Sequence, residues 1–329
     1  MATRVNRWTA LLLGLSILAA GASSSGCASK GTNASNMDAA DSAGSNQPVD
    51  TPPPAELRIV FVSDAGSGTD LYAMRPDGSA TIRITVDPET DFGPRVRRDE
   101  LVFGSLRAGR SILYRIVPGE TPAEVYRNPG REEVPDWSPD GEWMAFSTER
   151  DFNIDIFLAR PDGTPQRRLT SDPGHDTSPR WSPDGSQLVF VSDRAGQDDL
   201  FVIDFDGSTE RNLTRSPEDE GHPSWSPDGK SLLFSRTATG GAPDIFRLDI
   251  ETGGVVNLTN SPGWDAVSSW SPEGDRIAFT SNRDGNWEIY SMDPAGGDVR
   301  RLTNSPGFDG DPVWIRGTWI PAKVDDETR

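Results

Sequence analysis

Six acidic residues recur at one fixed position in this chain, five residues before a tryptophan motif or its degenerate copies. Carboxylates at one offset in successive repeats are expected on one face of the molecule, where they could together bind a cation or a basic peptide segment. Acidic side chains also brace their own loops by hydrogen bonding to the backbone, and that alternative stays open. The six residues are Asp91, Glu132, Asp176, Glu220, Asp265 and Asp309.

The two histidines of the chain, His175 and His222, lie six and three residues before their motif tryptophans. A two-histidine metal site assisted by Asp176 or Glu220 is one possibility, but protein metal sites usually draw on three or four converging ligands. Solvated loop histidines are the simpler interpretation. We therefore expect no bound cofactor and no protein-held metal, with a cation in a central channel as the one exception to consider.

Nucleophilic catalysis finds no support in the sequence. Peptidases that combine a propeller with an α/β-hydrolase domain need a Gly-x-Ser-x-Gly elbow, and the chain contains no such pentapeptide. We assign no catalytic residue. A further set of acids stands just before the third strand of each repeat, and we expect them to accept hydrogen bonds in the preceding turn. These residues are Asp70, Asp155, Asp199, Asp244 and Glu288.

The element that positions all these residues is a repeat. Its motif is Trp-Ser-Pro-Asp/Glu-Gly, and successive copies lie 44 or 45 residues apart, which is the length of a four-stranded propeller blade. Each large indole ring is expected to be buried between neighbouring blades. The motif tryptophans are Trp137, Trp181, Trp225, Trp270 and, in a degenerate copy, Trp314.

One repeat shows the strand pattern of a blade. Short β-branched and aromatic runs at 179–181, 188–192, 200–203 and 211–214 are separated by turn residues. The Ser-Pro-Asp-Gly sequence at 182–185 favours a type I turn, with Pro at its second position and Gly at its fourth. The sequence therefore predicts an antiparallel meander of four strands.

The third-strand and fourth-strand patterns each occur six times. The first repeat starts at its second strand, whereas the last tryptophan strand, at 312–315, has no repeat after it. We predict an all-β, six-bladed β-propeller over residues 57–316, closed by pairing of the N- and C-terminal strands. Closure leaves only short, protected sheet edges. Blade two deviates, since Pro-Arg-Val-Arg-Arg-Asp at 94–99 replaces the motif.

The residues before the repeat predict an export signal and a linker. Arg4 and Arg7 precede an apolar run at 10–22, which is shorter than the roughly 20 residues of a membrane span, and the signal ends at Cys27. We predict a lipoprotein-type signal over 1–27 with lipidation of Cys27, the alternative being cleavage to a soluble form. Residues 28–56 are small, polar and Pro-rich, which predicts a disordered tether. A short charged tail is expected at 317–329.

Net charge and cysteine content indicate which classes of partner and of covalent cross-link the protein can have. With 51 acidic and 32 basic residues, the formal net charge is −19, which argues against nucleic acid as a partner and favours cations or basic segments. The single cysteine excludes an intramolecular disulfide framework.

The motif also resembles a known family. Asp/Glu-x-x-x-Pro-x-Trp-Ser-Pro-Asp-Gly, followed by Ile-x-Phe-x-Ser and Asp-Ile-Tyr, resembles the PD40 repeat of the TolB propeller throughout the six units. The resemblance implies a monomeric, non-enzymatic platform in the periplasm or at the cell surface that connects envelope proteins or lipoproteins. Together with Cys27, it predicts membrane contact through a lipid anchor alone, at the outer membrane. TolB carries an α/β domain ahead of its propeller, where this chain has the predicted tether.

An enzyme is the competing interpretation, either a lyase or a glycosidase-like hydrolase acting on a glycan in the axial pocket. Carboxylates with perturbed pKa values and a converging histidine would favour the enzyme. A flat acidic face with exposed aromatic side chains would favour a binding protein, and Trp264 and Trp287 are candidates for such contacts.

Overall fold

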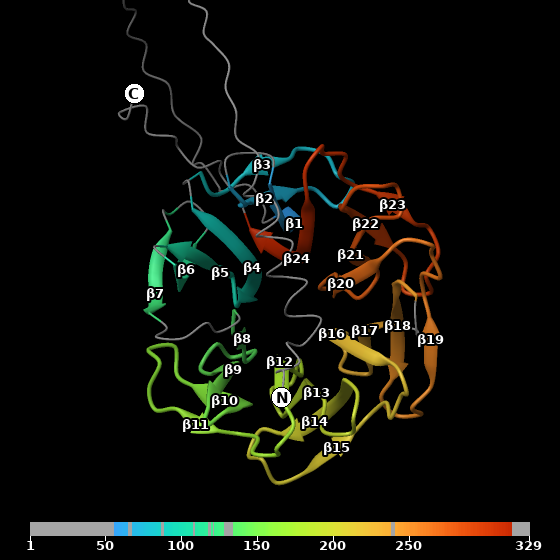
Figure 1. Cartoon of the computed structure of the whole chain (residues 1–329). Coiled ribbons are helices and arrows are strands. Elements are labelled where there is room, and N and C mark those ends of the chain that lie inside the picture. Colours follow the sequence, from blue (N-terminus) through green and yellow to red (C-terminus); the bar gives the residue numbers. More distant parts are fainter. Residues whose placement is uncertain are drawn as a thin grey trace, which may run out of the picture. The chain divides into compact units, whose positions relative to one another are not determined.

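The computed structural model describes residues 56–64, 68–86, 89–107, 109–117, 120, 122–127, 134–237 and 241–317. These residues form six four-stranded antiparallel sheets arranged as a ring, which confirms the predicted six-bladed propeller (Figure 1). The predicted signal, the tether up to residue 55, the tail from residue 318, Cys27 and Glu132 lie outside the described residues. Glu56 and Gly317, which the sequence assigned to the tether and the tail, belong instead to paired strands at the two ends of the propeller. No helix long and apolar enough to cross a membrane occurs in the described part of the chain.

Every blade runs from an inner strand at the axis to an outer strand at the rim (Figure 1). The first blade consists of β24 (Asp309–Gly317), β1 (Glu56–Ser63), β2 (Asp70–Met74) and β3 (Ile82–Arg83). The second consists of β4 (Thr90–Arg97), β5 (Glu100–Arg107), β6 (Arg110–Ile116) and β7 (Ala123–Arg127). The third consists of β8 (Asp136–Trp137), β9 (Met144–Arg150), β10 (Asn153–Ala159) and β11 (Arg167–Arg168).

The last three blades follow the same order. The fourth consists of β12 (Asp176–Trp181), β13 (Gln187–Ser192), β14 (Asp199–Asp204) and β15 (Glu210–Asn212). The fifth consists of β16 (Asp219–Trp225), β17 (Ser231–Thr237), β18 (Pro243–Asp249) and β19 (Val255–Asn257). The sixth consists of β20 (Asp265–Trp270), β21 (Ile277–Ser281), β22 (Glu288–Met292) and β23 (Arg300–Arg301).

The ring closes through the two ends of the repeat region, as predicted. Strand β24 pairs antiparallel with β1, in a register that sets Gly317 opposite Glu56 and Asp309 opposite Ser63. The C-terminal strand therefore supplies the inner strand that the first blade lacks in sequence order.

The tryptophan motif continues into the predicted turn. In the fourth blade the Gly185 amide donates to the Ser182 carbonyl at 2.9 Å, and Gly185 has a φ of 73°. Ser182 Oγ donates to Asp184 Oδ1 at 2.6 Å and accepts from the Gln187 amide at 3.0 Å. Ser, Asp and Gly in this motif thus hold the hairpin between the first and second strands.

A stacked aromatic pair forms part of the core of each blade. One ring comes from the second strand and the other from the third, as in Phe190 with Phe201, whose centroids lie 5.8 Å apart. Phe103, Phe190, Phe234 and Phe279 are essentially inaccessible to solvent. The threonine that follows the fourth strand adds a polar tie, since Thr214 Oγ1 accepts from the Leu200 amide at 3.1 Å. This bond explains the recurrent Leu-Thr of the sequence.

The motif tryptophans do not share one environment. Trp137, Trp181 and Trp314 are buried, with 4–6% of each side chain exposed, as expected for core residues. Trp225 and Trp270 are half-buried and pack against the core clusters of their own interfaces, so they bury less of the ring than the other three.

The strand directions give the disc two different faces. We call one the turn face; it carries the Ser-Pro-Asp-Gly turns at 138–141, 182–185 and 226–229 and the glutamate-bearing copy at 271–274. The loop face lies opposite and carries the hairpins between second and third strands and the loops that lead into each inner strand.

Candidate functional site at the axis and loop face

Six inner strands surround the axis: β4, β8, β12, β16, β20 and β24 (Figure 1). Each contacts the next around the ring, and β24 contacts β4 to complete it. Strand β12 begins at Asp176, three residues earlier than the predicted first strand, and β20 and β24 also begin at a repeated acid. The acids therefore belong to the inner strands themselves rather than to free loops.

The five described acids of the set are buried, with at most 2% of each exposed; they are Asp91, Asp176, Glu220, Asp265 and Asp309. The structure thus brings them to the loop-face end of the inner strands but withdraws them from solvent. These five acids therefore do not form a flat, exposed acidic face of the kind that would favour a binding protein over an enzyme. Partner binding by these residues and by Glu132 stays a prediction.

Three of these acids meet an arginine from the end of the second strand or from the turn that follows it. Arg194 Nη2 donates to both carboxylate oxygens of Asp176, at 2.8 and 2.9 Å. Arg236 donates to Glu220 Oε1 through Nε at 2.9 Å and Nη2 at 2.7 Å. Arg283 donates to Asp265 at 2.8 Å. Each carboxylate is therefore held by a charge-assisted hydrogen bond within its own blade.

The backbone amides of two of the described acids tie their blades to the preceding ones. The Asp91 amide donates to the Thr69 carbonyl at 2.8 Å, and the Glu220 amide donates to the Asp198 carbonyl at 2.8 Å. Burial raises the pKa of Asp176 and of Glu220, while hydrogen bonds from Thr170 and Thr214, respectively, oppose the rise. These contacts join neighbouring blades, but the carboxylates of Asp176 and Glu220 bond to arginine and threonine side chains rather than to the backbone of their own loops.

Asp309 differs from the other acids. In its blade, the sequence position that corresponds to Arg194 is occupied by an alanine, Ala65, which cannot pair with a carboxylate. Burial raises the pKa of Asp309 to about 6, against the hydrogen bonds of Ser63 and Thr303, and the nearby charge of Glu288 adds to the rise.

The acids before the third strands are structural, but their partners differ from those expected. Asp199 accepts from the Ser216 amide at 3.0 Å and from Asn212 Nδ2 at 2.7 Å, so its strongest contacts lie in the fourth strand and the loop beyond. Glu288 likewise accepts from Arg301 and from the Ser305 amide. Contacts to the preceding turn are longer, such as Gln197 to Asp199 at 3.3 Å.

A second polar cluster lies at the axis, and we call it the axial cluster. It comprises side chains from five different inner strands, namely Arg95, Asp136, Arg180, His222 and Asp311. Both arginines act electrostatically on Asp136, His222 and Asp311, although the five residues come from five blades. Such mutual proximity is possible only where the blades converge.

Burial is the main cause of the pKa shifts in the axial cluster. Burial raises the pKa of Asp136 and of Asp311 although Arg95 and Arg180 both lower them. Burial and the two arginines lower the pKa of His222 to about 3, so this imidazole is neutral at pH 7. Asp136 Oδ2 accepts the Trp181 amide at 2.8 Å, which links the cluster to the next blade.

Sequence reasoning missed the axial cluster. Arg95, Asp136 and Arg180 occupy the variable position of Pro-x-Trp, one residue before the motif position, and His222 and Asp311 lie two residues earlier. Charges at these places, inside strands that must face the axis of a closed propeller, are the signal that could have revealed it.

The histidine expectations are partly wrong. His222 is not a solvated loop residue: it lies in β16 at a bulge, with a φ of 52° and 9% exposed. His175 is half-buried on the loop face, with Nδ1 3.4 Å from Asp193. No group of three or more His, Cys, Asp or Glu side chains in the described residues converges as a metal site would require.

Aromatic side chains gather on the loop face where the sixth and first blades meet. Trp264 packs edge-on against Trp287 at 6.3 Å between centroids, and Phe308 lies 6.5 Å from Trp287. All three are half-buried. Phe152, at the tip of the β9–β10 hairpin on the same face, is 98% exposed.

Known proteins share this architecture and its repeat. The family described as the TolB β-propeller domain, PD40, matches residues 117–238 and 214–320. The Tol-Pal system protein TolB of Desulfosudis oleivorans is 35% identical over 122 residues, which are 36% of this chain and 28% of that protein. The match therefore spans little more than a quarter of the curated relative.

Solved structures extend the likeness of fold. TolB from Acinetobacter baumannii aligns with a TM-score of 0.71 at 23% identity, over 80% of this chain and 68% of that one. An oligogalacturonate lyase in complex with manganese aligns with a TM-score of 0.53 at 18% identity, over 74% and 73% of the two chains. The propeller fold therefore occurs both in TolB and in a lyase, so the fold by itself does not identify the family. The PD40 repeat does, because its family model matches more than half of the residues. The chain belongs to the TolB β-propeller family.

Proposed function

We propose that this protein is a non-enzymatic interaction scaffold of the cell envelope that binds partner proteins on its loop face. Family membership supports the envelope setting, because the curated relative is named a Tol-Pal system protein. The partner surface in this proposal is the exposed rim of the loop face, since the acids beneath it are buried and bonded within the ring.

Phe152 is the observation that carries the proposal. It occupies the second position of a two-residue turn in which Asp151 has a φ of 52° and Phe152 a φ of 64°. Such turns favour glycine at that position, and the second blade has Gly109 there at a φ of 72°. A phenylalanine that is 98% exposed in a conformation unfavourable to it gains nothing from the fold. Binding to a partner accounts for both features.

The aromatic group formed by Trp264, Trp287 and Phe308 supports the same conclusion. Protein interfaces are enriched in tryptophan and phenylalanine, and a few such side chains carry most of the binding energy. These three residues lie on the same face as Phe152 and remain half-accessible.

The test is photocrosslinking in intact cells with benzoylphenylalanine introduced at position 152. The matched control is the same group at Val256, which is 49% exposed on the outer strand β19. We expect position 152 to capture a small set of envelope proteins that position 256 does not, and Trp264→Ala with Trp287→Ala to reduce that capture. Equal capture at both positions would refute a loop-face interface.

A second candidate function is an enzyme acting on a uronate-bearing glycan, and the axial cluster favours it. Two arginines suit binding of carboxylate groups, and carboxyl groups with raised pKa values suit proton transfer. The assay follows release of unsaturated uronates from oligogalacturonate fragments. Turnover by the wild type that Arg180→Gln abolishes would establish this function, whereas no turnover leaves the scaffold as the better account.

Attachment of the scaffold to a membrane through Cys27 belongs to the same proposal. Detergent phase partitioning of the wild type against Cys27→Ala checks it. We expect the wild type in the detergent phase and the variant in the aqueous phase, and a wild type that stays aqueous would mean a freely soluble protein.

A further inference from the structure

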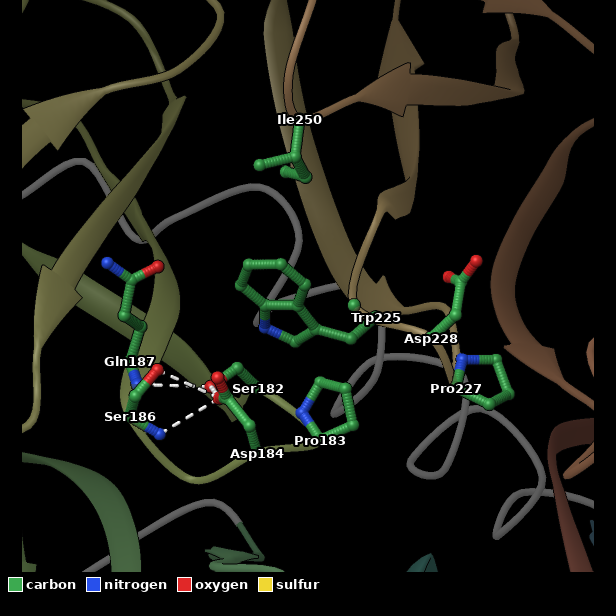
Figure 2. A pocket seen from close by; sticks show the side chains of 10 residues that line it. Ser182, Pro183, Asp184, Ser186, Gln187, Trp225, Pro227, Asp228 and Ile250 are labelled. Carbon is green, nitrogen blue, oxygen red and sulfur yellow. Dashed lines mark hydrogen bonds between the residues drawn. The ribbon is translucent and has the colours of Figure 1, made fainter.

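A cavity of about 310 Å³ opens on the turn face, between the fourth and fifth blades. Trp225 lies between the Ser182–Gln187 turn on one side and Pro227 and Asp228 on the other, with Ile250 beyond it (Figure 2). The cavity lies on the face opposite Phe152 and contains none of the loop-face or axial residues. It is separate from the surface to which we assign partner binding.

The preceding blade interface shows why the cavity exists. Between the third and fourth blades, Trp143 and Phe205 pack against each other at 5.7 Å, and Phe205 covers Trp181 at 5.5 Å. The corresponding residues beside Trp225 are Gln187 and Ile250. Two aromatic rings are thus replaced by smaller side chains, and the face of Trp225 is left half-accessible while Trp181 is 6% exposed.

The interface between the second and third blades shows what such a cavity can hold. There Arg97 takes the place of the motif serine, and its guanidinium lies over Trp137 at 4.9 Å from the ring centroid. Arg97 also donates to the Gly141 carbonyl, through Nη2 at 3.0 Å and Nε at 3.2 Å. Gly229 is the counterpart of Gly141 beside Trp225. In the described part of the chain, no cationic side chain stacks on Trp225.

The charges that line the cavity would also favour a cationic side chain such as an arginine. Asp184 and Asp228 both line it, and each uses Oδ1 for its own turn, accepting from Ser182 Oγ and Ser226 Oγ respectively at 2.6 Å. These serine hydroxyls lower the pKa of both carboxyl groups, so both are ionised at neutral pH. No arginine, lysine or histidine lines the cavity.

We propose that the cavity at Trp225 binds an arginine side chain presented by a partner protein, as Arg97 of the chain itself occupies the equivalent place at Trp137. The guanidinium stacks on the indole, donates to the Gly229 carbonyl and faces the carboxylates of Asp184 and Asp228. A planar guanidinium suits this arrangement better than the point charge of a lysine, because it stacks and donates in one plane.

The test is a titration of the full chain with the peptide acetyl-Gly-Arg-Gly-amide, followed through the indole Nε1–H signal of Trp225 by NMR. The signal is assigned by its loss in Trp225→Phe. We expect a salt-sensitive shift with millimolar affinity, and binding about tenfold weaker for the peptides with lysine or citrulline in place of arginine. No shift with the arginine peptide, or equal binding of all three peptides, would overturn the proposal.

Two variants separate this site from general surface charge. Gln187→Trp with Ile250→Phe refills the cavity as the preceding interface is filled, and we expect it to abolish the shift with little change in Tm. Asp228→Asn keeps the turn acceptor but removes the charge, and it should weaken binding several-fold. Asp77→Asn, in an exposed turn of the first blade on the same face, is the matched control and should bind like the wild type. If the refilled variant does not fold, unchanged binding by Asp228→Asn is the result that overturns the assignment.

Discussion

At the scale of single residues, Asp176, Glu220 and Asp265 each lose water on folding and gain one guanidinium. Desolvation of the carboxylate opposes this arrangement, and the arginine offsets the loss only while both partners remain. The pairs therefore fix the geometry of the ring more than they add to its stability. Asp309 is buried with hydroxyl partners in place of an arginine, and its burial therefore raises its pKa.

Removal of the arginine from one pair is expected to be costly. Arg194→Met leaves Asp176 buried without its partner, and we expect a loss of about 3 kcal/mol in the free energy of unfolding. Arg194→Met combined with Asp176→Asn should recover part of that loss, because the buried charge of Asp176 is removed while Glu210 still lacks the arginine that it meets in the wild type. Chemical denaturation of the two variants and the wild type measures the difference, and equal losses in both variants would contradict the pairing.

Asp309 is expected to make stability depend on pH in an unusual direction. Its pKa of about 6 in the folded state lies above the ordinary value of 3.8, so the folded chain binds the proton more tightly than the unfolded chain does. The contribution to stability is present below about pH 4 and is lost as the pH rises through 6, by about 3 kcal/mol in total. Asp309→Asn removes this dependence.

The measurement compares the variant with the wild type between pH 4 and 8. The difference in unfolding free energy should grow in favour of Asp309→Asn as the pH rises through 6, and then level off. A difference that does not change with pH would mean that Asp309 has an ordinary pKa.

At the scale of elements, the hairpin between the second and third strands is the most adaptable part of the blade. It supplies the arginines that hold the inner acids in the fourth and sixth blades, whereas in the fifth blade the arginine comes from the end of β17. In the third blade it instead presents Phe152 to solvent. The same structural element thus bonds to the inner acids in some blades and presents an exposed side chain to solvent in another.

The β9–β10 hairpin allows stability and binding to be separated. Phe152→Gly places a residue suited to positive φ in the turn and removes no packed side chain. We expect the free energy of unfolding to stay the same or to rise by up to about 1 kcal/mol, while co-purification of the partners that were captured from position 152 falls. A fall of several degrees in Tm would show that Phe152 packs against the fold.

At the scale of the whole molecule, closure makes the two ends of the repeat region interdependent. Strand β24 covers the edge of β1 and also contacts β4 and β20 in the neighbouring blades. Interfaces between neighbours supply much of the stability of repeat proteins, so an incomplete ring loses more than one strand.

Deletion of residues 310–329 tests this dependence. The first blade loses nearly all of its inner strand, and ladder groups of β1 become exposed. We expect Tm to fall by well over the roughly 2–4 °C that a change of 1 kcal/mol causes in a domain of this size. A truncated chain that melts like the wild type would contradict the observed closure.

The sequence alone determined the fold, because strand length and turn chemistry are local properties, and they recur in six units whose tryptophan motifs lie 44 or 45 residues apart. It also located the repeated acids and predicted that they share one end of the blades, where the structure places the five that it describes. Pro-x-Trp strands and Ser-Pro-Asp-Gly turns needed no tertiary information to be recognised.

Only the tertiary structure decided what those residues do, because burial and pairing across blades have no signature within a single repeat. It showed that Asp176 meets Arg194 and is buried, that Arg180 and His222 converge at the axis, and that Trp225 is half-open where Trp181 is covered. Each outcome depends on which side chains the neighbouring blade supplies. A periodic sequence specifies the ring, and differences between adjacent repeats specify its sites.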